Sequence, residues 1–182
     1  MYILTGELKG KKLKVPKGKF VRPTSGRVKK SIFDTIKIID KDTKVLDIFS
    51  GSGGLGIEAL SRGANYAVFV EINRAAAEIL NENIESCGYK YLSKILNFDF
   101  KKALSILRKS ENKFDLIFID PPYEIYEKIS INDLINLSGE LLDKNGMFII
   151  EHNTKAEVIN KYFTVKTKKY GETKISYLWR KN

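Results

Sequence analysis

A short acidic motif with two prolines, Asp120-Pro121-Pro122-Tyr123, follows an apolar run in this chain. The prolines fix φ at their own positions and disfavour the helical region for the residue before them, so the chain leaves the strand along a set path. A carboxylate and an outward-pointing backbone carbonyl together accept both hydrogens of an exocyclic amine, while Tyr123 offers a face for stacking. The motif therefore predicts a site for the amino group of guanine or adenine. The simpler interpretation is a strand that ends in a proline-rich turn.

A glycine-rich segment begins at Asp47 and reads Asp-Ile-Phe-Ser-Gly-Ser-Gly-Gly-Leu-Gly. Gly51, Gly53 and Gly56 have the G-x-G-x-x-G spacing, and Glu71 lies twenty residues after Gly51. A dinucleotide fold places its ribose-binding acid at about this distance, so NAD is one candidate cofactor. The position of Asp47 argues against NAD, because a pyrophosphate would lie close to its carboxylate.

S-adenosylmethionine presents the opposite charge here, because it carries a sulfonium and an α-amino group and has no phosphate. Asp47 would attract it, so electrostatics favours the methyl donor. Glu71 accepts from ribose hydroxyls with either cofactor. Asp99 is a candidate acceptor for the adenine amino group, although a helix cap is its simpler role. Phe49 and Phe100, which adjoin these acids, complete the candidate cofactor-binding set.

From residue 44 onward, short β-rich apolar runs alternate with segments of helical period, which indicates an α/β domain with a mostly parallel sheet. The expected strands are residues 44–49, 66–72, 93–98, 114–120 and 146–152. The expected helices are residues 55–62, 74–86, 100–109, a segment within 126–142, and 155–162. In open sheets of this kind, ligands bind beyond the carboxyl ends of the strands, which is where the candidate acids fall.

The C-terminal part of the chain departs from this alternation. Two β-prone runs, residues 164–169 and 174–179, are joined through Gly171 and predict an antiparallel hairpin at one sheet edge. Asn145-Gly146 predicts a turn before the fifth strand.

The N-terminal part is basic and punctuated by glycines. Residues 2–15 predict a small β element, and residues 25–39 carry the apolar stripe of an amphipathic helix. We therefore expect residues 1–40 to form a basic extension that packs on a single globular domain of residues 41–182.

The net charge of +10 is concentrated at the two ends of the chain. Residues 1–30 carry a net charge of +9 and residues 161–182 a net charge of +6, so the part between them is acidic. Clustered cations displace counterions from phosphates, so this asymmetry favours a polyanionic partner such as nucleic acid. A solvated lysine-rich surface is the simpler interpretation.

Composition narrows the remaining classes of protein. Cys87 is the one cysteine, which excludes an internal disulfide and a cysteine-based zinc site, and we expect no metal. His152 is the one histidine, and we expect a structural or peripheral role for it rather than general-base catalysis. No apolar run approaches the roughly 20 residues of a membrane span, and the N-terminus has no signal-peptide pattern. A cytoplasmic protein without membrane contact is the expectation.

Three of these segments together resemble the bacterial RsmD family, whose members methylate N2 of a guanine in 16S ribosomal RNA. They are residues 47–64, the Asp120 motif, and Arg22-Pro23-Thr24 followed by Arg27-Val28. The resemblance covers nearly the whole chain. It implies a Rossmann-like S-adenosylmethionine-dependent methyltransferase with a seven-stranded, mostly parallel sheet and a C-terminal antiparallel hairpin.

The resemblance also implies roles and partners. Arg22 and Thr24 would close over the methionine end of the cofactor, and Asp120 to Tyr123 would form the catalytic motif. The partner would be 16S rRNA or the assembling small ribosomal subunit, and a monomer is expected. An adenine-N6 methyltransferase on DNA or RNA is the second hypothesis, since only the resemblance separates it from the first. A dehydrogenase with a dinucleotide cofactor and a non-catalytic RNA-binding protein are the others.

Overall fold

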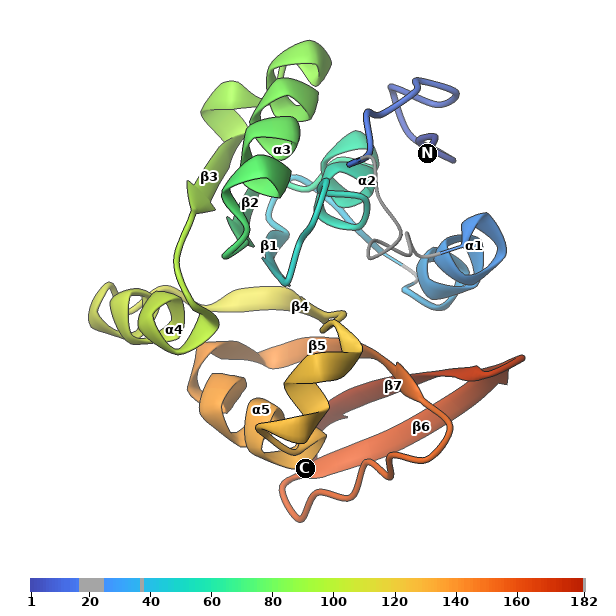
Figure 1. Cartoon of the computed structure of the whole chain (residues 1–182), viewed down its shortest axis with the longest axis vertical. Coiled ribbons are helices and arrows are strands. Elements are labelled where there is room, and N and C mark those ends of the chain that lie inside the picture. The colour runs from blue at the N-terminus through green and yellow to red at the C-terminus, as the bar shows by residue number, and fades with distance from the viewer. Residues whose placement is uncertain (17–24, 37, 182) are drawn as a thin grey trace.

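The protein, described here from a computed structural model, is built around one seven-stranded sheet; the structure describes residues 1–16, 25–36 and 38–181. The strand order is β3-β2-β1-β4-β5-β7-β6, parallel from β3 to β5, with β7 antiparallel to both of its neighbours (Figure 1). The strands are β1 Lys44–Ile48, β2 Tyr66–Val70, β3 Ser93–Leu96, β4 Phe114–Ile119, β5 Leu142–Asn153, β6 Phe163–Tyr170 and β7 Thr173–Arg180. The predicted α/β sheet and its closing hairpin are confirmed.

Five α-helices and three short 3-10 helices lie among the described residues. The α-helices are α1 Gly26–Thr35, α2 Gly56–Ser61, α3 Arg74–Cys87, α4 Phe100–Lys109 and α5 Ile131–Ser138. The 3-10 helices are η1 Lys90–Leu92, η2 Tyr123–Glu127 and η3 Gly139–Leu141. No helix in this part of the chain has the length and apolar character needed to cross a membrane.

The helix predicted for residues 25–39 ends earlier, at Thr35, and two expectations about local structure in the C-terminal half are wrong. Residues 155–162 form turns and irregular backbone rather than a helix, and Asn132 and Asn136 of α5 hold this segment through side-chain hydrogen bonds. Asn145-Gly146 lies inside β5 and does not precede it, because the register with β4 shifts between Phe114 and Leu116. In both segments, contacts with residues distant in the sequence determine the backbone conformation and override the local preference for a helix or a turn.

The N-terminal β element is smaller than predicted. It is a turn closed by one isolated bridge, Tyr2 to Lys12, with hydrogen bonds from the Ile3 N–H to the Lys11 carbonyl at 3.0 Å and from the Leu13 N–H to the Met1 carbonyl at 2.8 Å. Its apolar side chains Ile3 and Leu13 are buried in the main core. This segment is therefore held to the sheet domain by packing as well as by its own backbone pairing.

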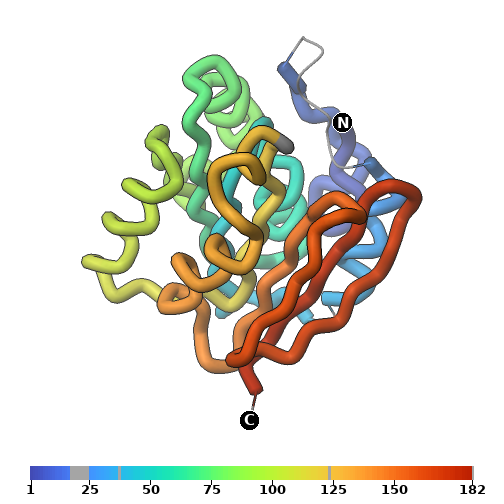
Figure 2. Tube along the Cα trace, turned by 60° about the horizontal axis from the view of Figure 1, so that its bottom comes forward, coloured from blue at the N-terminus to red at the C-terminus, as the bar shows by residue number. Residues whose placement is uncertain are grey.

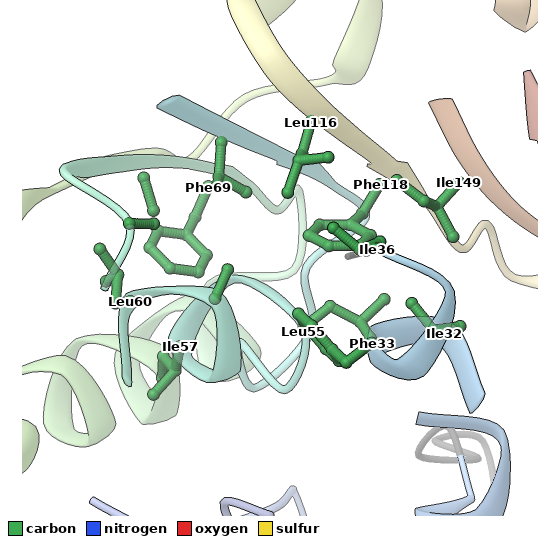
Figure 3. Packing of buried hydrophobic residues seen from close by; sticks show 14 of the residues in the cluster. Ile32, Phe33, Ile36, Leu55, Ile57, Leu60, Phe69, Leu116, Phe118 and Ile149 are labelled. Carbon is green, nitrogen blue, oxygen red and sulfur yellow. The ribbon is translucent and has the colours of Figure 1, made fainter. Parts of the chain in front are cut away.

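Helices cover both faces of the sheet, and each face has its own apolar core. Side chains of α1, α2 and α3 form the core on one face, and those of α4 and α5 form the core on the other. In the first core, the rings of Phe33 on α1 and Phe118 on β4 lie 5.7 Å apart, and Figure 3 shows Ile32, Ile36 and Ile149 gathered around them. Cys87 is buried in this core as a small apolar group.

A buried ionic network fastens the N-terminal segment and α1 to α2. Glu58 is fully buried, and its carboxylate accepts from the backbone N–H groups of Leu4 and Thr5 at 2.8 and 3.0 Å. It also pairs with Lys29 at 3.0 Å and with Arg62 at 3.1 Å. These bonds satisfy a charge that would otherwise be costly to bury, and they hold three separate parts of the chain together.

The C-terminal hairpin lies against α1, so the basic residues of α1 and those of the hairpin belong to neighbouring elements (Figure 2). The Lys168 Nζ donates to the Thr35 hydroxyl at 2.8 Å, and the hydroxyls of Ser31 and Tyr170 share a hydrogen bond. One basic residue does not add to the exposed charge: Lys29 is buried and paired.

Candidate active site

The register of the sheet aligns the residues that follow its central strands. Ile48 pairs with both Val70 and Ile119, and Ile119 pairs with Ile150. The residues that follow these four positions therefore form one row at the carboxyl edge of the sheet. In the order of the strands, the row is Glu71, Phe49, Asp120 and Glu151. Three of these four are acids that come from three different strands. The predicted meeting of acids at this edge is confirmed for Glu71 and Asp120.

Asp47, the last but one residue of β1, lies beneath this row and is buried. Its Oδ2 accepts a hydrogen bond from the Gly56 N–H at 2.9 Å, so the carboxylate holds the first residue of α2. Burial first, and then the negative charges of Asp120 and Glu71, raise the pKa of Asp47 to about 7, while the Gly56 hydrogen bond acts to lower it. The charges of Asp120 and Glu71 thus both disfavour ionisation of the Asp47 carboxyl.

The glycine loop, residues 51–56, has a backbone conformation that residues other than glycine rarely adopt. Gly51 and Gly53 have φ values of 53° and 84°. Gly56 has a different reason, because a Cβ there would lie 2.3 Å from the Phe69 ring. The Gly53 N–H donates to the Ser50 carbonyl at 2.7 Å, which closes the turn. Glycine is therefore required for left-handed backbone at Gly51 and Gly53, and for the close packing of α2 at Gly56.

Glu71 ties the loop to the end of β2. One carboxylate oxygen accepts from the Gly51 N–H and the other from the Asn73 N–H, both at 2.8 Å. The Asn97 side chain donates to the Glu71 backbone carbonyl at 2.6 Å. Each carboxylate oxygen has a further lone pair for a ligand hydroxyl. The carboxylate is therefore held in place by backbone bonds before any ligand binds.

Asp99 caps α4, because its side chain accepts from the Lys101 N–H at 2.9 Å. The cap is the simpler of the two roles predicted for Asp99, and its exposed carboxylate has further lone pairs for a second bond. The next residue, Phe100, is buried, and its ring lies 5.3 Å from that of Phe49. Phe49 has a φ of 65°, so the chain turns sharply where β1 leaves the sheet.

The proline motif begins where β4 ends. The Asp120 N–H still donates to the Ile48 carbonyl at 3.5 Å, and Pro121 is buried. Pro122 has extended backbone, and its carbonyl accepts from the Ile125 N–H at 3.0 Å as η2 begins. The prolines thus end the strand in a 3-10 turn, as the sequence predicts. Arg22, Thr24 and the side chain of Tyr123 lie outside the described residues.

Glu151 is an acid that sequence reasoning missed. It stands beside Asp120 in the row, it is half-buried, and the Tyr126 hydroxyl donates to its backbone carbonyl at 3.0 Å. A signal was present, because Glu151 directly follows an apolar run, just as Glu71 and Asp120 do.

His152 follows Glu151 and is buried away from the row, where its Nε2 lies 2.8 Å from the Ser176 hydroxyl. Burial lowers the pKa of His152. Over residues 1–16, 25–36 and 38–181, no group of three or more His, Cys, Asp and Glu side chains is arranged to hold a metal ion.

A mostly parallel sheet with an antiparallel last pair, a glycine loop after its first strand and acids along its carboxyl edge define a Rossmann-like methyltransferase fold. A family model described as "Conserved hypothetical protein 95" matches residues 1–179. Ribosomal RNA small subunit methyltransferase D of Buchnera aphidicola (subsp. Acyrthosiphon pisum) is 35% identical over 182 residues, which cover 98% of this chain and 92% of that relative. The chain belongs to this family, the RsmD family of methyltransferases.

Two further comparisons agree with this assignment. A protein of Bacillus subtilis described as "Putative rRNA methyltransferase YlbH" is 35% identical over 158 residues, with 87% of this chain and 85% of that relative covered. A solved structure described as "Putative methyltransferase yhhF from Escherichia coli" matches with a TM-score of 0.83 and 26% identity, over 100% of this chain and 98% of the other. The resemblance seen in the sequence motifs is confirmed.

Proposed function

We propose that this protein transfers the methyl group of S-adenosylmethionine to the exocyclic N2 amine of a guanine in small-subunit ribosomal RNA. The observation that carries the proposal is the buried carboxyl of Asp47 beside two further acids, since burial and then the negative charges of Asp120 and Glu71 raise the pKa of Asp47 to about 7. A cationic ligand offsets these negative charges, whereas the pyrophosphate of a dinucleotide would add to them. The negative charge at the carboxyl edge of the sheet therefore favours S-adenosylmethionine over NAD.

The residues at the carboxyl edge suit the parts of this cofactor. Glu71 accepts from the ribose hydroxyls, and the backbone at Gly51 and Gly53 lets the cofactor approach closely. The Asp99 carboxylate accepts from the adenine amino group, with Phe49 and Phe100 as the neighbouring apolar surface. Arg22 and Thr24 close over the methionine end. When bound, S-adenosylmethionine supplies an electrophilic methyl carbon on a positively charged sulfur.

Asp120 and the Pro121 carbonyl accept the two hydrogens of the guanine amine and direct its lone pair toward that methyl carbon. The new bond joins N2 to carbon as the carbon–sulfur bond breaks, and the bonding electron pair stays on sulfur. The Asp120 carboxylate stabilises the positive charge that develops on N2, which then loses one proton to water. Tyr123 stacks on the extruded base and contributes roughly 1 to 3 kcal/mol.

The two basic ends of the chain form the RNA-binding surface in this proposal. The contacts between α1 and the hairpin bring them together, so phosphates of one RNA segment can meet both. Residues 1–40 act as a basic extension on the methyltransferase domain of residues 41–182. The substrate is 16S rRNA or the assembling small subunit, and the active protein is a monomer.

The test is methyl transfer followed by mapping of the product. Small ribosomal subunits from cells that lack this methylation are incubated with the protein and labelled S-adenosylmethionine, and the RNA is digested to nucleosides. We expect N2-methylguanosine at one position, and recovery of N6-methyladenosine instead would replace this proposal with the adenine hypothesis. Asp120→Ala should bind the cofactor normally and lose most of the turnover, whereas Asp42→Ala, an exposed acid, should change neither. Normal turnover by Asp120→Ala would contradict the mechanism.

A further inference from the structure

Glu151 lies next to the Asp120 motif and has no part in the mechanism above. The pairing of Ile119 with Ile150 places it on the neighbouring strand at the level of Asp120. Neighbouring strands lie about 4.8 Å apart, so the two backbones are within the span of one purine edge. The antiparallel pairing with Ile175 on β7 holds Glu151 from its other side.

Asp120 and Glu151 also belong to the same face of the sheet. Side chains alternate along a strand, and Phe118 on β4 and Ile149 on β5 both lie in the core beneath α1. Asp120 and Glu151 each lie two residues farther along the same strand, so their side chains belong to the same face of the sheet as those of Phe118 and Ile149. The Oε2 atom of Glu151 is buried, so the carboxylate does not extend into bulk solvent.

A direct bond couples the two elements. The Tyr126 hydroxyl, from η2 just after the prolines, donates to the Glu151 carbonyl at 3.0 Å. The turn that carries the motif is thereby fixed to the backbone of Glu151. A base that is bound by Asp120 is consequently held in a fixed position relative to the backbone that carries the second carboxylate.

The edge of guanine beside its N2 amine explains what a second carboxylate does. Guanine presents a hydrogen on N1 next to the amine, so the N1 and N2 part of its edge consists of donors. Adenine presents an N1 lone pair next to its own amine, and a carboxylate repels a lone pair. Enzymes read an extruded base by hydrogen bonds to this edge. A site with one carboxylate for the amine and a second carboxylate for the N1 hydrogen would therefore bind guanine and exclude adenine.

We infer that Glu151 is a specificity-determining residue that accepts the N1 hydrogen of the target guanine while Asp120 holds its N2 amine. This inference rests on the proposed function and deepens it. It assigns the choice between the guanine and adenine hypotheses to one side chain, whereas the Asp120 motif serves either amine.

The test compares guanine with 2-aminopurine, which keeps the amine on carbon 2 and has an N1 lone pair in place of the N1 hydrogen. Small subunits are assembled with one or the other base at the mapped position, and kcat/KM is measured for each. The wild-type protein should strongly prefer guanine. Glu151→Gln should lower that preference by about tenfold or more, because its amide NH2 donates to the N1 lone pair and its charge is gone. Glu157→Gln, an exposed acid in a neighbouring loop, is the matched control and should leave the preference unchanged.

Further measurements separate the possible failures. An unchanged preference in Glu151→Gln overturns the role of Glu151, while the proposed function stands if the wild-type protein still produces N2-methylguanosine. Wild-type protein that methylates no guanine N2 overturns both. Loss of S-adenosylmethionine affinity in Glu151→Gln, measured by calorimetry and equal to the loss of activity, would assign Glu151 to the cofactor and overturn the inference. If circular dichroism shows that Glu151→Gln is unfolded, Glu151→Asp carries the test, with a lower rate on guanine and no gain on 2-aminopurine expected.

Discussion

The carboxylate of Asp47 accepts a hydrogen bond from the backbone N–H of Gly56 across 2.9 Å, in the buried space beneath the glycine loop. One side chain near the end of β1 therefore holds the start of α2 and carries a charge that its surroundings oppose. Its hydrogen bond and its charge have different consequences, and separate substitutions test them.

The charge of Asp47 should make folding stability depend on pH. Burial raises the pKa of Asp47 from 3.8 to about 7 in the folded protein. The folded state thus binds this proton more tightly, so the stabilising contribution is fully present below pH 3.8 and is lost as the pH rises through about 7. Asp47→Asn keeps an oxygen for Gly56 and removes the charge, so we expect a higher Tm than wild type at pH 8 and a smaller difference at pH 5. Asp47→Ala, which also loses the hydrogen bond, should be less stable than Asp47→Asn at both values, and equal Tm values would contradict this.

The same charge should discriminate the methyl donor from its product. S-adenosylmethionine is cationic at sulfur and S-adenosylhomocysteine is not, so an ionised Asp47 favours the former. We expect wild-type affinity for S-adenosylmethionine to rise between pH 6 and pH 8 more than affinity for the product. Asp47→Asn should weaken methyl-donor binding about tenfold more than product binding, a change equal to about one pKa unit. Isothermal titration calorimetry measures both, and parallel losses for the two ligands would rule out a charge effect.

Close packing at the loop should make Gly56 intolerant of even a methyl group. A Cβ there would meet the Phe69 ring at 2.3 Å and the Asp47 Oδ2 at 3.1 Å. We expect Gly56→Ala to destabilise the fold by about 1 to 3 kcal/mol and to weaken cofactor binding, because α2 must shift away from β2. Urea unfolding measures the first effect. Gly26→Ala, at the start of α1 with open space around it, is the control and should be neutral or slightly stabilising.

The buried ion pair of Lys29 and Glu58 should matter far more than an exposed pair on the same helix. Burial lowers the pKa of Lys29 in opposition to the nearby Glu58 charge. Lys29→Met leaves Glu58 with Arg62 and backbone donors alone, so we expect a loss of about 3 to 5 kcal/mol in the free energy of unfolding. Lys30→Met breaks only the exposed pair with Asp34 and should change it by less than about 1 kcal/mol. Similar losses for the two variants would mean that Lys29 contributes through its position on α1 and not through its charge.

Much of the architecture follows from the order of residues along the chain. The alternation of apolar runs with helical periods places β1 to β4 and the helices α2, α3 and α4 within one or two residues of where they lie. The ends of strands also identify Glu71 and Asp120, because an acid that directly follows a buried run must stand at the sheet edge. Local pattern suffices there, since the spacing of apolar residues within a short segment marks both its type and the side that it buries.

Other features depend on contacts between residues far apart in the sequence. Asn132 and Asn136 hold residues 155–162 in irregular backbone, and the register shift against β4 draws Asn145-Gly146 into β5. The partnership of Lys29 with Glu58 turns a cation that the sequence assigns to a charged surface into a buried structural bond.

The sequence by itself determined which chemical groups this protein carries to the carboxyl edge of its sheet, because each is marked by its neighbours in the chain. Only the tertiary structure decided which of them stand side by side. The register that aligns Glu151 with Asp120 arises from hydrogen bonds between strands that lie more than twenty residues apart, and no local pattern encodes it.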